Sequence, residues 1–217
     1  MSSSDGHAHN PNLAHHFDTI EKQDYAARLG MWLFLGTEVL LFAGLFLGYT
    51  VYRHFYHDAF HHCSRALNVY MGMANTFVLI TSSLTVALAY WAVKVGKKTL
   101  AIGMLVFTIA CAFAFLGIKY MEYSHKFHVG ELPGKWFHAE ELMKYPGANL
   151  YFTIYFLTTG LHAFHVIVGM SVLAWVLKGI VKGRYTPDYY VPVELGALYW
   201  HLVDLVWIFL FPLLYLI

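Results

Sequence analysis

Charged side chains are scarce in this sequence: Asp, Glu, Lys and Arg together make up 12% of its 217 residues. A soluble domain carries about 25% charged residues, so the composition excludes an ordinary soluble protein. The net charge is only +1, and the few cations form no basic face, which argues against a nucleic-acid partner. Hydrophobic residues make up 59% of the chain, and the mean hydropathy is +0.52. We therefore expect an integral membrane protein.

Cysteine is rare as well, with two residues in the chain. Cys63 is predicted in a loop and Cys111 inside an apolar run, so we expect neither an internal disulfide nor a paired-cysteine metal site. Cys111 is interpreted as a small buried hydrophobic residue.

In place of charge, the sequence has a series of long apolar runs. Each is long enough to cross a bilayer as a helix, and each is apolar on all sides, unlike the alternating strands of a membrane β-barrel. The sequence predicts an all-α integral membrane bundle of five transmembrane helices over residues 28–217, after a polar tail over residues 1–27. The predicted spans cover about residues 29–51, 70–93, 99–118, 150–177 and 195–217.

The polar tail contains His7, His9, His15 and His16 together with four acidic residues. It lacks the apolar segment of a secretory signal peptide, and its acidic residues are atypical of a mitochondrial transit peptide. We therefore expect the chain to lie in a bacterial inner membrane. The histidines could bind adventitious metal, but the favoured interpretation is a solvated, disordered tail.

The distribution of Lys and Arg predicts the orientation of the chain. Eight of these residues fall on the N-terminal side of the membrane and six on the other side. The segment KVGKK at 94–98 concentrates lysine on the N-terminal side, whereas the long loop at 119–149 mixes lysine with four glutamates. By the positive-inside rule, the N-terminus is predicted inside and the C-terminus outside.

Glu38 is the only formally charged residue between Arg28 and Arg53. At a rise of about 1.5 Å per residue it lies about 15 Å into its span, near the middle of the bilayer. A charged group at that depth costs about 2.5–3.5 kcal/mol. Glu38 is therefore a candidate functional residue that needs a partner.

Four more ionisable side chains are expected at similar depths, about 9–22 Å from the inner side: His162, His165, His201 and Asp204. His162 and His165 are three residues apart and share a helix face. His201 and Asp204 are also three residues apart and share a face of another helix. We predict that these residues and Glu38 form a buried polar network. Glu38 is expected to bond His165 or His201, because an unpaired buried carboxyl is costly.

Other roles for this layer stay open. Haem or metal ligation is disfavoured, because two histidines one turn apart on one helix do not face each other across a porphyrin. A proton relay is a third interpretation, since intramembrane Glu, Asp and His mark relays in pumps. No catalytic residue, cofactor site or metal site is assigned to this chain.

Three stretches resemble subunit III of the haem-copper oxidases, in the order and on the spans that this family has. They are GMWLFLGTEVLLF (30–42), FLTTGLHAFHVIVG (156–169) and YWHLVDLVWIFLF (199–211), and GIKYMEY (117–123) is similar to the family's acidic helix end. The resemblance covers essentially the whole chain after about residue 25.

The resemblance implies a non-catalytic subunit of a proton-pumping terminal oxidase, whose haem and copper lie in subunits I and II. Such a subunit packs against subunit I, holds phospholipids in a cleft, and protects sustained turnover and proton uptake. It also implies that Glu38 is the family's membrane-buried, carbodiimide-reactive carboxylate. His201 and Asp204 match its last-helix pair, and His162 and His165 match its G-x-H-x-x-H segment.

The long members of this family have seven helices, so a five-helix chain is similar to the short form. That form lacks the hairpin that builds one wall of the lipid cleft. Subunit III of a quinol oxidase and the accessory subunit of a nitric oxide reductase are alternatives within the same resemblance. A stand-alone proton or ion transporter using Glu38 and Asp204 is an alternative of another class, although no internal repeat or broken helix pair supports it. A membrane b-type cytochrome is a further alternative.

Overall fold

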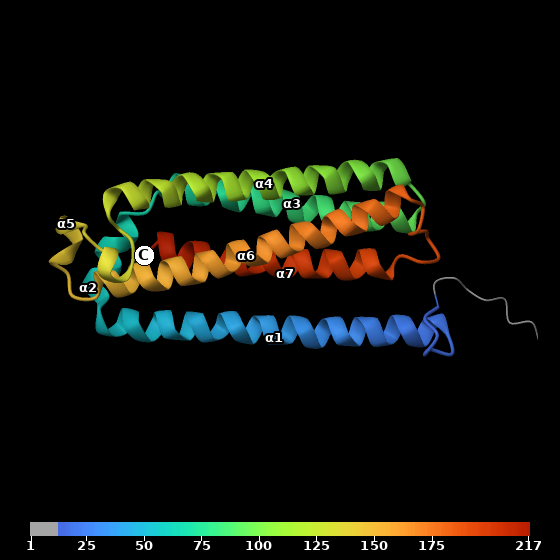
Figure 1. The fold of residues 1–217 in the computed structure, drawn as a ribbon, viewed down its shortest axis with the longest axis horizontal. Helices are drawn as coiled ribbons and strands as arrows, with labels where there is room; N and C mark the ends of the chain where they lie inside the picture. The colour runs from blue at the N-terminus through green and yellow to red at the C-terminus, as the bar shows by residue number, and fades with distance from the viewer. Residues whose placement is uncertain (1–12) are drawn as a thin grey trace, which may run out of the picture.

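The computed structural model describes residues 13–217 and shows a long bundle of helices (Figure 1). Within these residues there is no β-strand, only two isolated bridges. Five helices are long and apolar enough to cross a membrane: α1 (Ile20–Phe55), α3 (Val69–Lys94), α4 (Lys98–Val129), α6 (Ala148–Val181) and α7 (Val191–Tyr215). The predicted all-α fold with five spans is therefore confirmed. Of the tail histidines, His7 and His9 lie outside the described residues.

Helix α1 begins well before the first predicted span. The Thr19 hydroxyl caps the helix by accepting a 3.3 Å hydrogen bond from the Lys22 backbone N–H, as N-cap residues do. The helix then runs for 36 residues, which is about 54 Å at the usual rise. A bilayer's hydrocarbon core is about 30 Å thick, so α1 extends beyond the apolar layer. Part of the segment expected to be a polar tail is helical.

Helices α3, α4, α6 and α7 pack around a core of large buried side chains, and α1 lies along one side of them (Figure 1). Gly169 of α6 allows α7 to come close, because a Cβ at this position would lie 2.9 Å from the Trp200 ring. Helix α1 is attached more loosely. In its most apolar segment 11% of the residues are buried, against 28–50% in the other four spans.

Two short helices, α2 (His57–Arg65) and α5 (Glu140–Met143), lie with a 3₁₀ turn (Gly134–Trp136) at the end of the bundle that contains the C-terminus (Figure 1). The buried face of α2 fixes its position. Phe60 packs 5.3 Å from the Tyr49 ring, and the Ser64 hydroxyl donates a 2.6 Å hydrogen bond to the Ile217 carbonyl.

Cys63 lies on this buried face, in helix α2 and not in the loop that the sequence predicted. The physical reason is the helical spacing of Ala59, Phe60, Cys63 and Ser64, which gives a short polar segment one buried side. Burial of Cys63 raises the pKa of its thiol to about 12. Both cysteines are free thiols.

Candidate functional site

Glu38 of α1 and His165 of α6 form a pair that joins the two helices. His165 Nε2 lies 2.7 Å from Glu38 Oε2, and His165 Nδ1 lies 2.7 Å from the Leu161 carbonyl. The Glu38 side chain is 15% exposed and the His165 side chain is 11% exposed. Glu38 therefore has the histidine partner expected for it, and of the two candidates that partner is His165.

The hydrogen bonds of His165 restrict where the protons of this pair lie. A carbonyl oxygen only accepts, so Nδ1 carries a hydrogen toward Leu161. A neutral His165 then offers Nε2 as an acceptor, and Glu38 donates as a carboxylic acid. If instead Nε2 carries the proton, an imidazolium faces a carboxylate. Both arrangements have zero net charge, which limits the cost of placing the pair between membrane helices.

The remaining members of the predicted layer point elsewhere. His201 Nδ1 lies 2.7 Å from the Ser83 hydroxyl of α3. Asp204 also has Ser83 as a neighbour, but neither of its carboxylate oxygens has a partner at hydrogen-bond geometry in the described residues. His162 is fully buried, with ring centroids of Phe115 at 5.4 Å and Trp207 at 5.2 Å.

Neither ring nitrogen of His162 has a hydrogen-bond partner within residues 13–217. No hydrogen bond in this part of the chain connects His162, His201 or Asp204 to the Glu38–His165 pair. The five residues therefore do not form one hydrogen-bonded network. His165 faces α1, whereas His201 faces α3.

A second buried polar cluster is one that the sequence reasoning missed. Glu122 Oε2 accepts a 2.9 Å hydrogen bond from Lys119 Nζ, and Glu122 Oε1 accepts from the hydroxyls of Tyr155 (2.9 Å) and Tyr215 (2.6 Å). Lys119 also donates to the Tyr215 hydroxyl at 2.7 Å. The cluster joins α4, α6 and α7.

The sequence predicts that the third span ends at about residue 118, just before Lys119, and that Glu122 lies in the loop at 119–149. The helix instead continues to Val129, where Gly130 ends it at φ 79°, the left-handed conformation typical of a helix C-terminus. The three-residue spacing of Lys119 and Glu122, which places both on one helix face, was the available signal.

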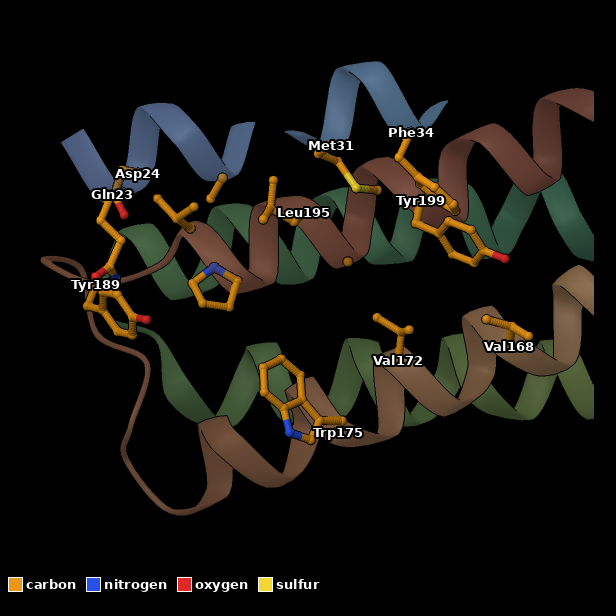
Figure 2. A pocket seen from close by; sticks show the side chains of 14 residues that line it. Gln23, Asp24, Met31, Phe34, Val168, Val172, Trp175, Tyr189, Leu195 and Tyr199 are labelled. Atoms are coloured by element: carbon orange, nitrogen blue, oxygen red, sulfur yellow. The ribbon is translucent and has the colours of Figure 1, made fainter. Parts of the chain in front are cut away.

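A groove of about 410 Å³ lies between α1, α6 and α7 near the start of α1 (Figure 2). Most of its lining is apolar, and the polar residues Gln23 and Asp24 lie near the N-terminal end of α1. The other lining residues are Ala27, Met31, Phe34, Val168, Val172, Trp175, Tyr189, Val191, Pro192, Leu195, Gly196 and Tyr199. Beside it, Arg28 holds α1 to α7 through two hydrogen bonds to Glu194, of 2.9 and 3.1 Å.

Trp175 separates this groove from a smaller, basic pocket of about 180 Å³. Lys178, Lys182 and Arg184 line the pocket, and none of them makes an ion pair within residues 13–217. Tyr185 closes another side, and its ring lies 6.1 Å from that of Trp175. Unpaired cations beside an apolar groove are suited to an anionic headgroup with its acyl chains.

Within the described residues, no group of three or more His, Cys, Asp or Glu side chains could hold a metal ion. The family model described as cytochrome c oxidase subunit III matches residues 11–131 and 141–217. The chain belongs to the cytochrome c oxidase subunit III family. The Glu38–His165 pair, the Lys119–Glu122 cluster and the groove all lie within the matched residues.

Individual relatives of this chain are described as the same subunit. Cytochrome c oxidase subunit 3 of Gallus gallus is 29% identical over 219 residues, which span 93% of this chain and 72% of the relative. Cytochrome c oxidase subunit 3 of Allomyces macrogynus is 28% identical, over 93% of this chain and 69% of the relative. Membership of this family implies that the chain works with other oxidase subunits in a membrane.

Proposed function

We propose that this chain is the non-catalytic subunit III of a proton-pumping terminal oxidase of the cytochrome c oxidase type. In this proposal the chain packs directly against subunit I and stabilises it, and subunit II belongs to the same complex. The chain also supports proton uptake. Haem and copper belong to those partners, and this chain holds none. The complex lies in a bacterial inner membrane, with the N-terminus of the chain inside and its C-terminus outside, as expected from the sequence.

The observation that carries this proposal furthest is the apolar groove with its adjoining basic pocket. We propose that the two together hold an anionic phospholipid at the inner surface of the membrane. A phosphate bound by Lys178, Lys182 and Arg184 would place acyl chains along Trp175 and the groove. Lipid tails are as apolar as the groove, so the tails add little driving force. The cations, each worth about 1 kcal/mol toward anionic lipid, select the headgroup.

The loose attachment of α1 supports a role for such a lipid. Apart from its polar ties to α6 and α7, α1 exposes large apolar side chains along its length, including Trp32, Leu40 and Phe55. A lipid in the groove fills the space between α1 and the other helices, and so presents a continuous apolar body to subunit I.

The membership in an oxidase complex is tested by purifying the tagged chain in mild detergent and recording a reduced-minus-oxidised spectrum. The spectrum is repeated after the partners are stripped away. Haem present before stripping and absent afterwards supports the proposal. Haem retained by the stripped chain would make it a cytochrome, and no haem at either stage would favour an independent transporter. Turnover with reduced cytochrome c or with quinol identifies the electron donor.

The lipid proposal is tested by mass spectrometry of phospholipid that stays with the purified complex. Replacing Lys178, Lys182 and Arg184 by alanine is expected to remove tightly held anionic lipid. A matched control replaces Lys22, Lys94 and Lys97, which lie outside the pocket. Retention of anionic lipid in the pocket variant, or equal loss in the control, would contradict the assignment of the headgroup site.

A further inference from the structure

Helix α2 presents a rigid, exposed face that the proposed oxidase role does not use. Its other face is buried through Ala59, Phe60, Cys63 and Ser64, and the Phe60 ring packs 5.2 Å from the Tyr151 ring of α6. The backbone of α2 is therefore held in place by the bundle, and the side chains of its outer face project from a fixed support.

Two histidines stand one turn apart on that outer face. His57 and His61 are four residues apart, and their ring planes are inclined by only 8° with centroids 6.3 Å apart. The His57 side chain is 68% exposed. Two histidines at this spacing on a helix point the same way and can share one metal ion, as they do in zinc enzymes with the H-E-x-x-H motif. Only side-chain rotations are needed to bring two ring nitrogens to one ion.

The two neighbouring charges act on the histidine pair in different ways. The Asp58 carboxylate lies 3.6 Å from His57 Nδ1, where a small rotation would let it accept the Nδ1 hydrogen and leave Nε2 for a metal. Carboxylates play this orienting role behind many metal-bound histidines. Arg65, one turn beyond His61, lowers the pKa of that ring. The positive charge of Arg65 would repel a metal ion bound to the two histidines, and the negative charge of Asp58 offsets this repulsion.

We propose that His57 and His61 bind a divalent transition-metal ion, of the Zn²⁺, Cu²⁺ and Ni²⁺ class, on the outer face of α2, where His57 is exposed and His61 is partly buried. Imidazole nitrogen is a preferred ligand of these ions. No third His, Cys, Asp or Glu in residues 13–217 completes the site, so water fills the remaining positions. Such a site exchanges its metal readily and is open to a further ligand.

The test measures zinc bound at equilibrium dialysis to the full-length protein, purified with its partners and without a histidine tag. The His57→Ala/His61→Ala variant is compared with a His54→Ala/His62→Ala control, which removes two neighbouring histidines instead. The His57/His61 variant is expected to lose one zinc per protein, and the control to lose none. Asp58→Asn is expected to weaken binding by about 10-fold, the lower end of the effect of removing an orienting partner.

A second measurement uses the unmodified protein and so does not depend on folding of a variant. Carbethoxylation of histidines by diethyl pyrocarbonate is followed residue by residue by mass spectrometry, with and without Zn²⁺. Zn²⁺ is expected to slow modification of His57 and His61 at least several-fold and to leave His54 unchanged. Unchanged zinc content in the His57/His61 variant, equal loss in the control, or absence of protection at these two rings would overturn the proposal.

Discussion

Removing the Lys119 ammonium tests what holds α4 to α6 and α7. Lys119→Met keeps most of the apolar length of the side chain and deletes its charge. The Glu122 carboxylate then keeps the hydroxyl donors of Tyr155 and Tyr215 but loses the cation 2.9 Å away. Both side chains of the pair are 4% exposed, so the substitution leaves a buried, uncompensated carboxylate.

The size of the effect follows from that burial. Breaking a buried ion pair by removing one partner costs about 3–5 kcal/mol. Glu122 also borders a hollow of about 640 Å³, formed with Lys126 and residues 66–71. Water entering from this hollow can solvate the orphaned carboxylate, so we expect a loss of about 3 kcal/mol for Lys119→Met. Replacing both partners, as in Lys119→Met/Glu122→Gln, leaves no unpaired charge at these two positions and is expected to cost less than the single change.

The assay is reversible unfolding of the full-length protein in mixed micelles of mild detergent and sodium dodecyl sulfate, followed by tryptophan fluorescence. The double-mutant cycle on Lys119 and Glu122 gives the coupling energy directly. Lys144→Met, at an exposed lysine, is the control and is expected to change stability by less than about 0.5 kcal/mol. A cost for Lys119→Met as small as that of the control, or single costs that simply add in the double variant, would refute this account of the cluster.

Three further substitutions or reagents test other parts of the structure. Glu38→Gln is expected to leave assembly intact and turnover little changed, because an amide can donate to His165 Nε2; loss of the complex on a native gel would contradict this. Gly169→Ala is expected to lower stability in the same unfolding assay by about 1–3 kcal/mol, since its Cβ would lie 2.9 Å from the Trp200 ring; no change would show that α7 shifts freely. Cys63 is expected to resist maleimide in the folded protein even at mildly alkaline pH, because its thiol is fully buried and its pKa is raised to about 12; mass spectrometry after labelling, with unfolded protein as control, detects any modification.

The five spans could be predicted because hydrocarbon imposes one strong condition, a long run without charge. The same condition misplaced the end of the third span. A prediction from charge alone places Lys119 and Glu122 in water. In the fold they are buried, because they form hydrogen bonds with each other and with two tyrosines. The tyrosines come from α6 and α7, and nothing in the sequence near residue 119 shows that they will be adjacent.

The polar layer shows a similar division between what could and could not be predicted. Depth along a helix follows from the rise per residue, and it indicated that Glu38 and His165 lie at comparable levels. Direction around the helix axis depends on which helices are neighbours, and the sequence did not supply that. His201 is predicted to lie in the same layer, yet it bonds Ser83 of α3. Equal depth was therefore a necessary condition for a network and not a sufficient one.

The position of α1 depends more on a few specific ties than on extensive packing. Its interface with the other helices is small, and lipid competes equally well for its apolar side chains. Three contacts are spread along it: Arg28 to Glu194 near the start, Glu38 to His165 in the middle, and Tyr49 against Phe60 near the end. The first two are polar and directional, so they fix rotation and depth, which apolar contacts with lipid cannot do. The groove extends along α1 from Gln23 to Phe34, past the first tie and short of the second. The polar pairs thus hold α1 in place and leave room for a lipid beside it.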